Sequence, residues 1–171
     1  MLLGKVIKNI DKKYRDVYFK DIRFNSKKCK PNDIFFAIQG NNYNGNRYIY
    51  DAINNGAKII VSSLKLTRFN TKKVLFIHSK NPRKELSDIA SQFYKLKPKN
   101  IIAVTGTNGK TSIANFYQQI LSLNNKKVAS IGTLGVLSKQ LNLKTNNTTI
   151  DSVNIHKILQ KLKKLRVNNV I

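Results

Sequence analysis

A glycine-rich turn that ends in a lysine and a threonine is the part of this chain best suited to chemistry. Residues 100–104 are mainly apolar, and residues 106–111 then read Gly-Thr-Asn-Gly-Lys-Thr. Glycines let backbone N–H groups point inward and let a phosphate approach without a Cβ in the way. A helix that starts near Lys110 would add the partial positive charge of its N-terminus. The turn is therefore predicted to bind nucleotide phosphates.

Two side chains in this turn have distinct expected roles. In a phosphate-binding loop (P-loop) the lysine reaches the terminal phosphates and the following hydroxyl holds Mg²⁺, and here these are Lys110 and Thr111. The general pattern has another glycine five residues before Gly109, where this chain has Val104, so the match is to a shortened loop. A plain glycine-rich turn with a solvent-facing lysine is the alternative. The strand expected before the turn and the helix expected after it favour phosphate binding.

Apolar patterns predict the elements that hold this loop. Strands are expected at residues 22–24, 34–38, 58–61, 74–77, 100–104 and 127–131. Helices are expected between Tyr48 and Gly56 and at residues 81–95, 110–123 and 151–165, the second of them capped by Asn81. Because strands alternate with helices, the chain is predicted to be α/β, with largely parallel pairing in its second part.

Finer expectations concern the second part of the chain. Residues 132–147 should contain a hairpin or loop, and Val170-Ile171 resemble the first residues of another strand. Helix 110–123 carries apolar residues at helical spacing, namely Ile113, Phe116, Tyr117, Ile120 and Leu121. Asn147-Thr148-Thr149 precede helix 151–165 and are candidates to begin and cap it.

Lys97-Pro98-Lys99 interrupts the helical pattern and suggests a domain boundary, with domains at residues 1–97 and 98–171. The second of these would hold few strands, so its core would be thin. We therefore expect either that the chain is a fragment or that its second half leans on the first half or on a partner.

The net charge of +24 comes mainly from lysine, and the lysines are spread along the whole chain. A solvated lysine surface explains this better than a nucleic-acid site, although it favours polyanionic ligands such as ATP and nucleotide sugars. One cysteine, Cys29, excludes an internal disulfide framework and fits a reducing cytoplasm. No apolar run reaches the roughly 20 residues of a membrane span, and no signal peptide is evident. His78 and His156 lack metal-ligand spacing.

Several segments together resemble a known family. The loop Val104–Ser112 closely resembles the ATP loop of the Mur ligases, the ATP-dependent amide-forming ligases of peptidoglycan precursor synthesis. Asp21–Lys27 with Pro31–Gly40 is similar to the family's N-terminal domain, and Gly45–Ile49 with Ala52–Ala57 extends that likeness. Within the family, the remaining segments resemble the branch that adds the third residue of the stem peptide: Ile131–Gly135, Asn147–Thr149 and Asp151-Ser152.

This resemblance implies a uridine-diphosphate-binding N-terminal domain followed by the beginning of a P-loop central domain, truncated at residue 171. It also implies a reaction in which ATP phosphorylates the terminal carboxylate of a UDP-muramoyl dipeptide and a diamino acid attacks the resulting acyl phosphate. The ATP contacts would be Gly106, Thr107, Asn108, Gly109, Lys110, Thr111 and Ser112, with Lys110 on the transferred group and Thr111 on Mg²⁺. The UDP-sugar-peptide contacts would be Phe24, Ser26, Asn41, Asn42, Tyr43, Asn147, Thr148 and Thr149.

The sequence also departs from the family pattern. Asn25 and Lys27 replace an aspartate and an arginine beside Ser26, Asn41 stands where histidine is common, and Ile150 stands where proline is common. The family's acidic Mg²⁺ ligand, its carbamylated lysine and its C-terminal amino-acid-binding domain would lie beyond Ile171. We therefore expect that the chain alone does not complete the ligation.

Other functions remain open from the sequence alone. They are the Mur ligase that adds D-alanyl-D-alanine, a folate-type polyglutamate ligase, a non-catalytic module that binds nucleotide sugars and, less well supported, a nucleic-acid binder. The sequence does not identify the third amino acid, diaminopimelate or lysine, nor the oligomeric state.

Overall fold

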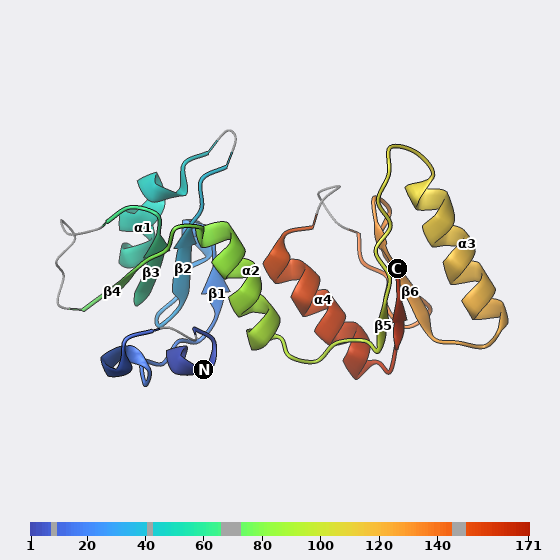
Figure 1. The fold of residues 1–171 in the computed structure, drawn as a ribbon, viewed down its shortest axis with the longest axis horizontal. Coiled ribbons are helices and arrows are strands. Elements are labelled where there is room, and N and C mark those ends of the chain that lie inside the picture. The colour runs from blue at the N-terminus through green and yellow to red at the C-terminus, as the bar shows by residue number, and fades with distance from the viewer. Residues whose placement is uncertain (8–9, 41–42, 66–72, 145–149) are drawn as a thin grey trace. The chain divides into compact units, whose positions relative to one another are not determined.

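The computed structural model describes residues 1–7, 10–40, 43–65, 73–144 and 150–171, and the chain divides into two compact units, Met1–Phe93 and Tyr94–Ile171. Each unit contains a four-stranded sheet with helices beside it (Figure 1). The α/β architecture expected from the sequence is confirmed. The functional domain limits at residues 1–97 and 98–171 stay a prediction. Within the described residues, no helix is both long enough and apolar enough to cross a lipid bilayer.

The sheet of the first unit is entirely parallel and runs in chain order, β1-β2-β3-β4. Its strands are β1 (Ile22–Arg23), β2 (Ile34–Ala37), β3 (Ile59–Ser62) and β4 (Leu75–His78), with helices α1 (Ile49–Asn54) and α2 (Pro82–Phe93). These elements confirm the predicted pattern, with one difference. The apolar alternation does not extend past β1, because Ile22 is buried but Phe24 is 42% exposed.

Helices cover both faces of this sheet, which is why β2 and β3 are buried at every residue. On one face α1 contributes Ile49 and Ala52 to a cluster with Phe35, Ala37 and Ile60. Helix α2 also contacts β2 but adds nothing to that cluster, and its Leu86, Ile89 and Ala90 are buried. Because neighbouring strand residues point to opposite faces, α2 covers the face of β2 that α1 does not.

The start of α2 follows the sequence prediction closely. Pro82 is its first residue, where a missing N–H costs nothing. The Asn81 side chain accepts a hydrogen bond from the Lys84 N–H at 3.0 Å, which satisfies one free donor of the first turn. The helix begins three residues after Ser79, whose N–H makes the last bond to β3, to the Ser62 carbonyl.

A buried carboxylate joins β1 to the segments that precede β2 and β3. Asp33 is fully buried, and its Oδ2 accepts hydrogen bonds from Arg23 Nε at 2.9 Å and from the Lys30 N–H at 3.1 Å. Its backbone carbonyl accepts a bond from the Lys58 N–H at 3.0 Å. Arg23 also contacts Asp21 at 2.8 Å, so one guanidinium neutralises two carboxylates. Residues 31–33 thus form a tight corner of the chain, with Asn32 at a φ of 68°.

The sheet of the second unit has the order β5-β8-β6-β7, and only β7 is antiparallel to its neighbour. Its elements are β5 (Asn100–Ile101), α3 (Lys110–Leu123), β6 (Val128–Gly132), β7 (Gly135–Leu137), α4 (Ser152–Lys164) and β8 (Asn169–Val170). Strands β6 and β7 form the hairpin anticipated after residue 131. Gly135 has a φ of 95°, and a Cβ there would collide with the Leu143 carbonyl, so this turn requires glycine.

Helix α4 packs on one face of this sheet and is capped by Asp151. Its Leu159 and Leu162 form a cluster with Ala129 of β6 and Val170 of β8. The Asp151 carboxylate accepts hydrogen bonds from the Val153 and Asn154 N–H groups at 3.1 and 2.9 Å. The suggestion that residues 147–149 cap this helix is therefore wrong, because Asp151 holds the N-cap position. Residues 147–149 themselves lie outside the described residues.

Helix α3 differs from the usual pattern of an amphipathic helix on a sheet. None of its residues is buried, although it contacts β6. The apolar residues Ile113, Phe116, Ile120 and Leu123 form an exposed stripe, and Phe116 is 62% and Leu123 is 83% exposed. Two isoleucines of the segment leading out of β5, Ile101 and Ile102, are also exposed. The apolar spacing of this helix thus predicted its existence but not its burial in this chain.

We expect Arg23→Met to destabilise the first unit, because it leaves the Asp33 carboxylate buried without its charge partner. The Arg23 side chain is 21% exposed and that of Asp33 only 1%, so the expected loss is about 2 kcal/mol, below that of a fully buried pair. Urea denaturation measures the loss. Arg47→Met is the matched control, since Arg47 is exposed and carries the same charge. Equal effects of the two substitutions would contradict a structural role for the ion pair.

Cys29 should make stability depend on alkaline pH. Burial and, to a smaller extent, the Asp33 carboxylate raise the pKa of its thiol to about 12, and Arg23 opposes the shift. A raised pKa means that the folded state favours the protonated thiol, so this contribution is present below the ordinary thiol pKa and is lost as pH rises toward about 12. Denaturation at pH 8 and above pH 10 should show a steeper loss for the unsubstituted chain than for Cys29→Ala. Parallel losses would rule the contribution out.

Candidate phosphate-binding site and adjacent pocket

The glycine-rich turn lies between the end of β5 and the first residue of α3. Gly106 and Gly109 have φ values of 150° and 79°, and Gly109 is the N-cap residue of α3. A Cβ on Gly109 would meet no atom within 4 Å, so its backbone conformation and not crowding requires glycine there. Open space over Gly109, together with the free N–H groups of the first turn of α3, suits an incoming anion.

Lys110 folds back over this turn from the first position of α3. Its Nζ donates hydrogen bonds to the carbonyl oxygens of Gly106 and Thr107, the latter at 3.1 Å. Both carbonyls are neutral acceptors in an exposed loop, so a phosphate would compete strongly for the same ammonium group. The loop and its lysine thus form one unit, and the role of Lys110 at a nucleotide phosphate stays a prediction.

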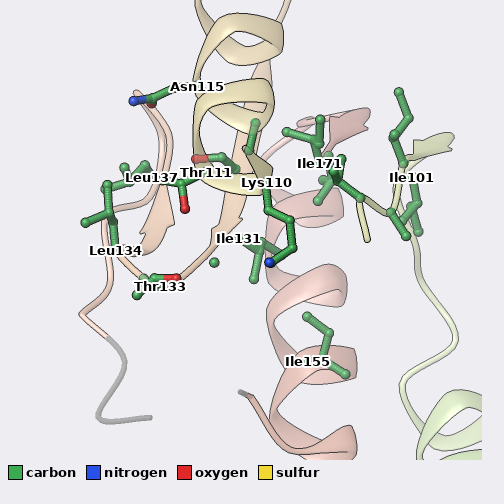
Figure 2. Close-up of a pocket in the computed structure, with 18 of the residues that line it drawn as sticks. Ile101, Lys110, Thr111, Asn115, Ile131, Thr133, Leu134, Leu137, Ile155 and Ile171 are labelled. Carbon is green, nitrogen blue, oxygen red and sulfur yellow. The ribbon is translucent and has the colours of Figure 1, made fainter. Parts of the chain in front are cut away.

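A pocket of about 440 Å³ opens beside Lys110. It lies where β5, β6 and β8 end, and parallel α/β sheets usually bind ligands at this edge. Figure 2 shows Lys110 and Thr111 reaching into it from the start of α3, with Thr133 and Leu134 of the β6–β7 turn beside them and Ile155 of α4 below. Its polar side chains are few and its remaining lining is mostly aliphatic. The polar ones are Lys110, Thr111, Asn115, Ser130 and Thr133.

The described residues offer little to a metal ion. No group of three His, Cys, Asp or Glu side chains lies close enough together there to hold one. The Thr111 hydroxyl is exposed and beside the phosphate loop, and Mg²⁺ commonly takes most of its ligands from phosphates and water. Thr111 therefore fits a magnesium ion that arrives with a nucleotide. His156 lies on α4, where burial and the positive charge of Lys97 lower the pKa of its imidazole.

In the first unit, the expected nucleotide-sugar contacts follow the carboxyl ends of β1 and β2. Phe24 is half exposed directly after β1, and Tyr43 is 73% exposed in the turn after β2. Ser26 is buried, and its carbonyl accepts bonds from the Cys29 N–H at 3.0 Å and from Asn55 Nδ2 at 3.1 Å. Phe24 and Tyr43 thus have surface to offer a ligand, whereas Ser26 is built into the packing. Asn41, Asn42 and residues 147–149 lie outside the described residues, and their roles stay predictions.

One residue that positions the phosphate loop was missed by sequence reasoning. Gln118 of α3 donates from Nε2 to the Leu137 carbonyl of β7 at 3.0 Å and accepts from Ser130 Oγ of β6 at 3.1 Å. It therefore ties the helix that begins with Lys110 to both strands of the hairpin that lines the pocket. No local signal distinguishes it from Gln119, its exposed neighbour. Thr133 and Leu134 were noted only as part of a family likeness and not as pocket residues.

A parallel α/β sheet with a glycine-rich turn and a lysine at the start of the following helix defines a nucleotide-binding protein. Comparison with known families narrows this class. Residues 19–94 match the model of the Mur ligase family catalytic domain, and residues 104–171 match that of the Mur ligase middle domain. The chain belongs to the Mur ligase family.

Curated relatives carry more specific names. A "UDP-N-acetylmuramoyl-L-alanyl-D-glutamate--2,6-diaminopimelate ligase" of Rickettsia montanensis is 38% identical over 158 residues, covering 90% of this chain and 32% of the relative. A ligase of the same name from Wigglesworthia glossinidia brevipalpis is 36% identical over 163 residues, covering 91% and 33%. The chain therefore spans about a third of the length of the curated relatives it matches.

Solved structures share the fold. One described as a UDP-N-acetylmuramoyl-L-alanyl-D-glutamate--2,6-diaminopimelate ligase superimposes with a TM-score of 0.78 at 24% identity, covering 99% of this chain and 35% of that one. A MurF ligase from Thermotoga maritima in complex with ADP gives a TM-score of 0.51 at 24% identity, covering 67% and 26%. At these identities the likeness supports the fold alone.

We expect Gln118→Leu to loosen α3 from the hairpin, because it leaves the buried Ser130 hydroxyl and the Leu137 carbonyl without their partner. Each unsatisfied group costs on the order of 1 kcal/mol, so the second unit should lose about 1–2 kcal/mol. Hydrogen exchange along α3 should rise in this variant. Gln119→Leu, an adjacent and exposed site, should leave the exchange unchanged. The contact has no positioning role if both variants exchange alike.

Proposed function

We propose that this chain provides the UDP-sugar-binding and ATP-binding portions of a cytoplasmic ligase of peptidoglycan precursor synthesis. The ligase would add the third amino acid to UDP-N-acetylmuramoyl-dipeptide at the expense of ATP. The observation that carries the proposal is the turn from Gly106 to Thr111, with Lys110 at the start of α3, in a chain that matches two Mur ligase domains. The names of the relatives favour 2,6-diaminopimelate as the incoming amine.

The reaction proposed here has two steps. An oxygen of the terminal substrate carboxylate bonds to the γ-phosphorus of ATP as the bond from that phosphorus to the β–γ bridging oxygen breaks, so ADP leaves. The amine nitrogen then bonds to the activated carbonyl carbon and loses a proton, the bond from carbon to the phosphate oxygen breaks, and inorganic phosphate leaves. Both steps build negative charge on phosphoryl oxygens, which a fixed cation stabilises.

The residues of the second unit fit the phosphate part of this chemistry. Lys110 would exchange its bonds to the Gly106 and Thr107 carbonyls for bonds to the transferred phosphoryl group. The N–H groups from Gly106 to Ser112 would surround the β- and γ-phosphates, and Thr111 would bind Mg²⁺ together with them. Once a substrate fills it, the aliphatic lining of the pocket beside Lys110 would keep water out of part of this space, which would strengthen electrostatic interactions there.

The first unit would hold the nucleotide sugar. Phe24 and Tyr43 present aromatic surface for the uracil base, and Ser26, Asn41 and Asn42 belong to the segments on either side. Asn147, Thr148 and Thr149 would bind the sugar-peptide part through amide and hydroxyl groups. The excess of positive charge on the chain attracts both anionic substrates from a distance.

A non-catalytic nucleotide-sugar-binding module is the second candidate, because the chain spans only about a third of its relatives. ADP release with UDP-N-acetylmuramoyl-dipeptide and 2,6-diaminopimelate is the first measurement, and turnover by this chain alone would establish the ligase. Binding of both nucleotides without turnover is expected of either function. An in-frame continuation of the coding sequence that carries the acidic and lysine motifs of the family would then favour the ligase, and its absence would favour the module. Turnover only with a tripeptide precursor and D-alanyl-D-alanine would instead indicate the other Mur ligase.

Lys110→Met should weaken ATP binding by about tenfold or more, since it removes a charge-assisted contact to the phosphates. Titration of the whole chain with ATP and Mg²⁺ measures the change. Lys126→Met is the control, because it removes an equal charge just beyond the opposite end of α3. If the two variants bind ATP equally, the phosphate site does not lie at this loop.

A further inference from the structure

An arginine on α2 holds the turn that follows β2. Arg83 lies in the first turn of α2, and its Nη2 donates a hydrogen bond to the Gln39 carbonyl at 3.2 Å. The two residues are 44 positions apart in the sequence, and they meet because α2 contacts β2 and begins near the carboxyl ends of the strands. Nothing in the local sequence around Arg83 signals this contact.

The segment that Arg83 contacts has a defined base. Gln39 and Asn44 form an antiparallel bridge, the Gly40 N–H donates to the Tyr43 carbonyl at 2.7 Å, and the Gly45 N–H donates to the Ile38 carbonyl at 3.0 Å. These bonds close the base of the turn. They therefore fix the positions of the segment that enters the turn and of the segment that leaves it. Tyr43, which is largely exposed, is itself part of this base.

The two sides of this turn are held by different kinds of residue. On the far side, buried Ser62 of β3 donates from Oγ to Asn46 Oδ1 at 2.8 Å, which is a neutral and sheltered contact. At the Gln39 end of the turn, the residue that holds the backbone is Arg83, which is exposed. A backbone carbonyl needs only one neutral donor, yet the guanidinium carries a full charge and five N–H donors. A single bond to the Gln39 carbonyl uses only one of these donors.

The surroundings indicate what the additional donors would meet. Phe24 follows β1, the strand that pairs with β2, and Tyr43 belongs to the turn after β2, so both exposed rings belong to segments that leave the sheet after neighbouring parallel strands. Aromatic faces stack on nucleobases, and the planar fork of a guanidinium matches the oxygens of a phosphate. A site with both features suits a nucleoside diphosphate better than a neutral sugar.

We propose that Arg83 positions the base of the turn after β2, formed by Gln39, Gly40, Tyr43 and Asn44, and binds the diphosphate of the nucleotide sugar, an inference that rests on the proposed function. One N–H of Arg83 keeps the Gln39 carbonyl in place while the others contact the phosphates. Arg83 is thereby a specificity residue, because it favours a nucleoside diphosphate over the bare nucleoside.

The test uses the whole chain, with UDP and uridine as probes, and calorimetric titration as the measurement. Arg83→Ala should weaken UDP binding about tenfold and uridine binding much less, so the ratio of the two affinities falls. Arg83→Lys should recover part of the loss because it restores the charge but not the fork. Lys84→Ala is the matched control, since Lys84 is the adjacent exposed residue of the same helical turn with the same charge.

Each outcome decides a separate claim. Equal losses in Arg83→Ala and Lys84→Ala would reduce Arg83 to a general positive charge and overturn its specific role. An equal loss for UDP and uridine would leave a positioning role for the turn and overturn the diphosphate contact. If the unsubstituted chain binds UDP and Arg83→Ala binds it as tightly, the inference about Arg83 fails alone. If the unsubstituted chain does not bind UDP, the proposed function fails and the inference fails with it.

Discussion

The second unit depends on how a strand becomes a helix over nine residues. The chain leaves β5, turns through two glycines with positive φ, and enters α3 with backbone N–H groups that have no partner inside the helix. Lys110 bends back onto the carbonyls that the turn exposes, so the positive side chain lies over the loop before any ligand does. The aliphatic ends of β5, β6 and β8 then place an apolar pocket beside this concentration of positive charge. This geometry suits a ligand in which an anionic group lies next to an apolar or weakly polar group.

The first unit positions its candidate binding residues with an entirely parallel sheet. Since all four strands run in the same direction, their carboxyl ends face the same way, and the segments that follow β1 and β2 carry the exposed Phe24 and Tyr43. A charge network around a buried carboxylate lies toward the starts of β2 and β3. Asp33 links the turn before β2 to Arg23 of β1 and to Lys58 before β3. Among the described residues, Phe24 and Tyr43 take no part in this network and are available to a ligand.

Much of this arrangement could be predicted because its causes are local. A few neighbouring residues determine each of three features: the turn from Gly106 to Thr111, the cap of α2 at Asn81 and the buried strand β2. The predictions that failed or were missed concern contacts between distant segments. Gln118 and Arg83 are ordinary polar residues on helices, and their partners lie 12 to 19 and 44 positions away. Likewise, the apolar spacing of α3 does not reveal whether another element covers its apolar side chains. Asp151, and not residues 147–149, caps α4 because its carboxylate accepts hydrogen bonds from two N–H groups.

The uncovered stripe of α3 has a consequence for how copies of the chain behave toward one another in solution. Ile113, Phe116, Ile120 and Leu123 would adhere to the same stripe on a second molecule if nothing opposed the approach. The net charge of +24 opposes it through mutual repulsion that extends about 10 Å at 0.1 M salt and shortens as salt is added. Colloidal stability of this chain is therefore electrostatic in origin, so dilute buffers keep it dispersed and concentrated salt brings molecules within reach of their apolar surfaces.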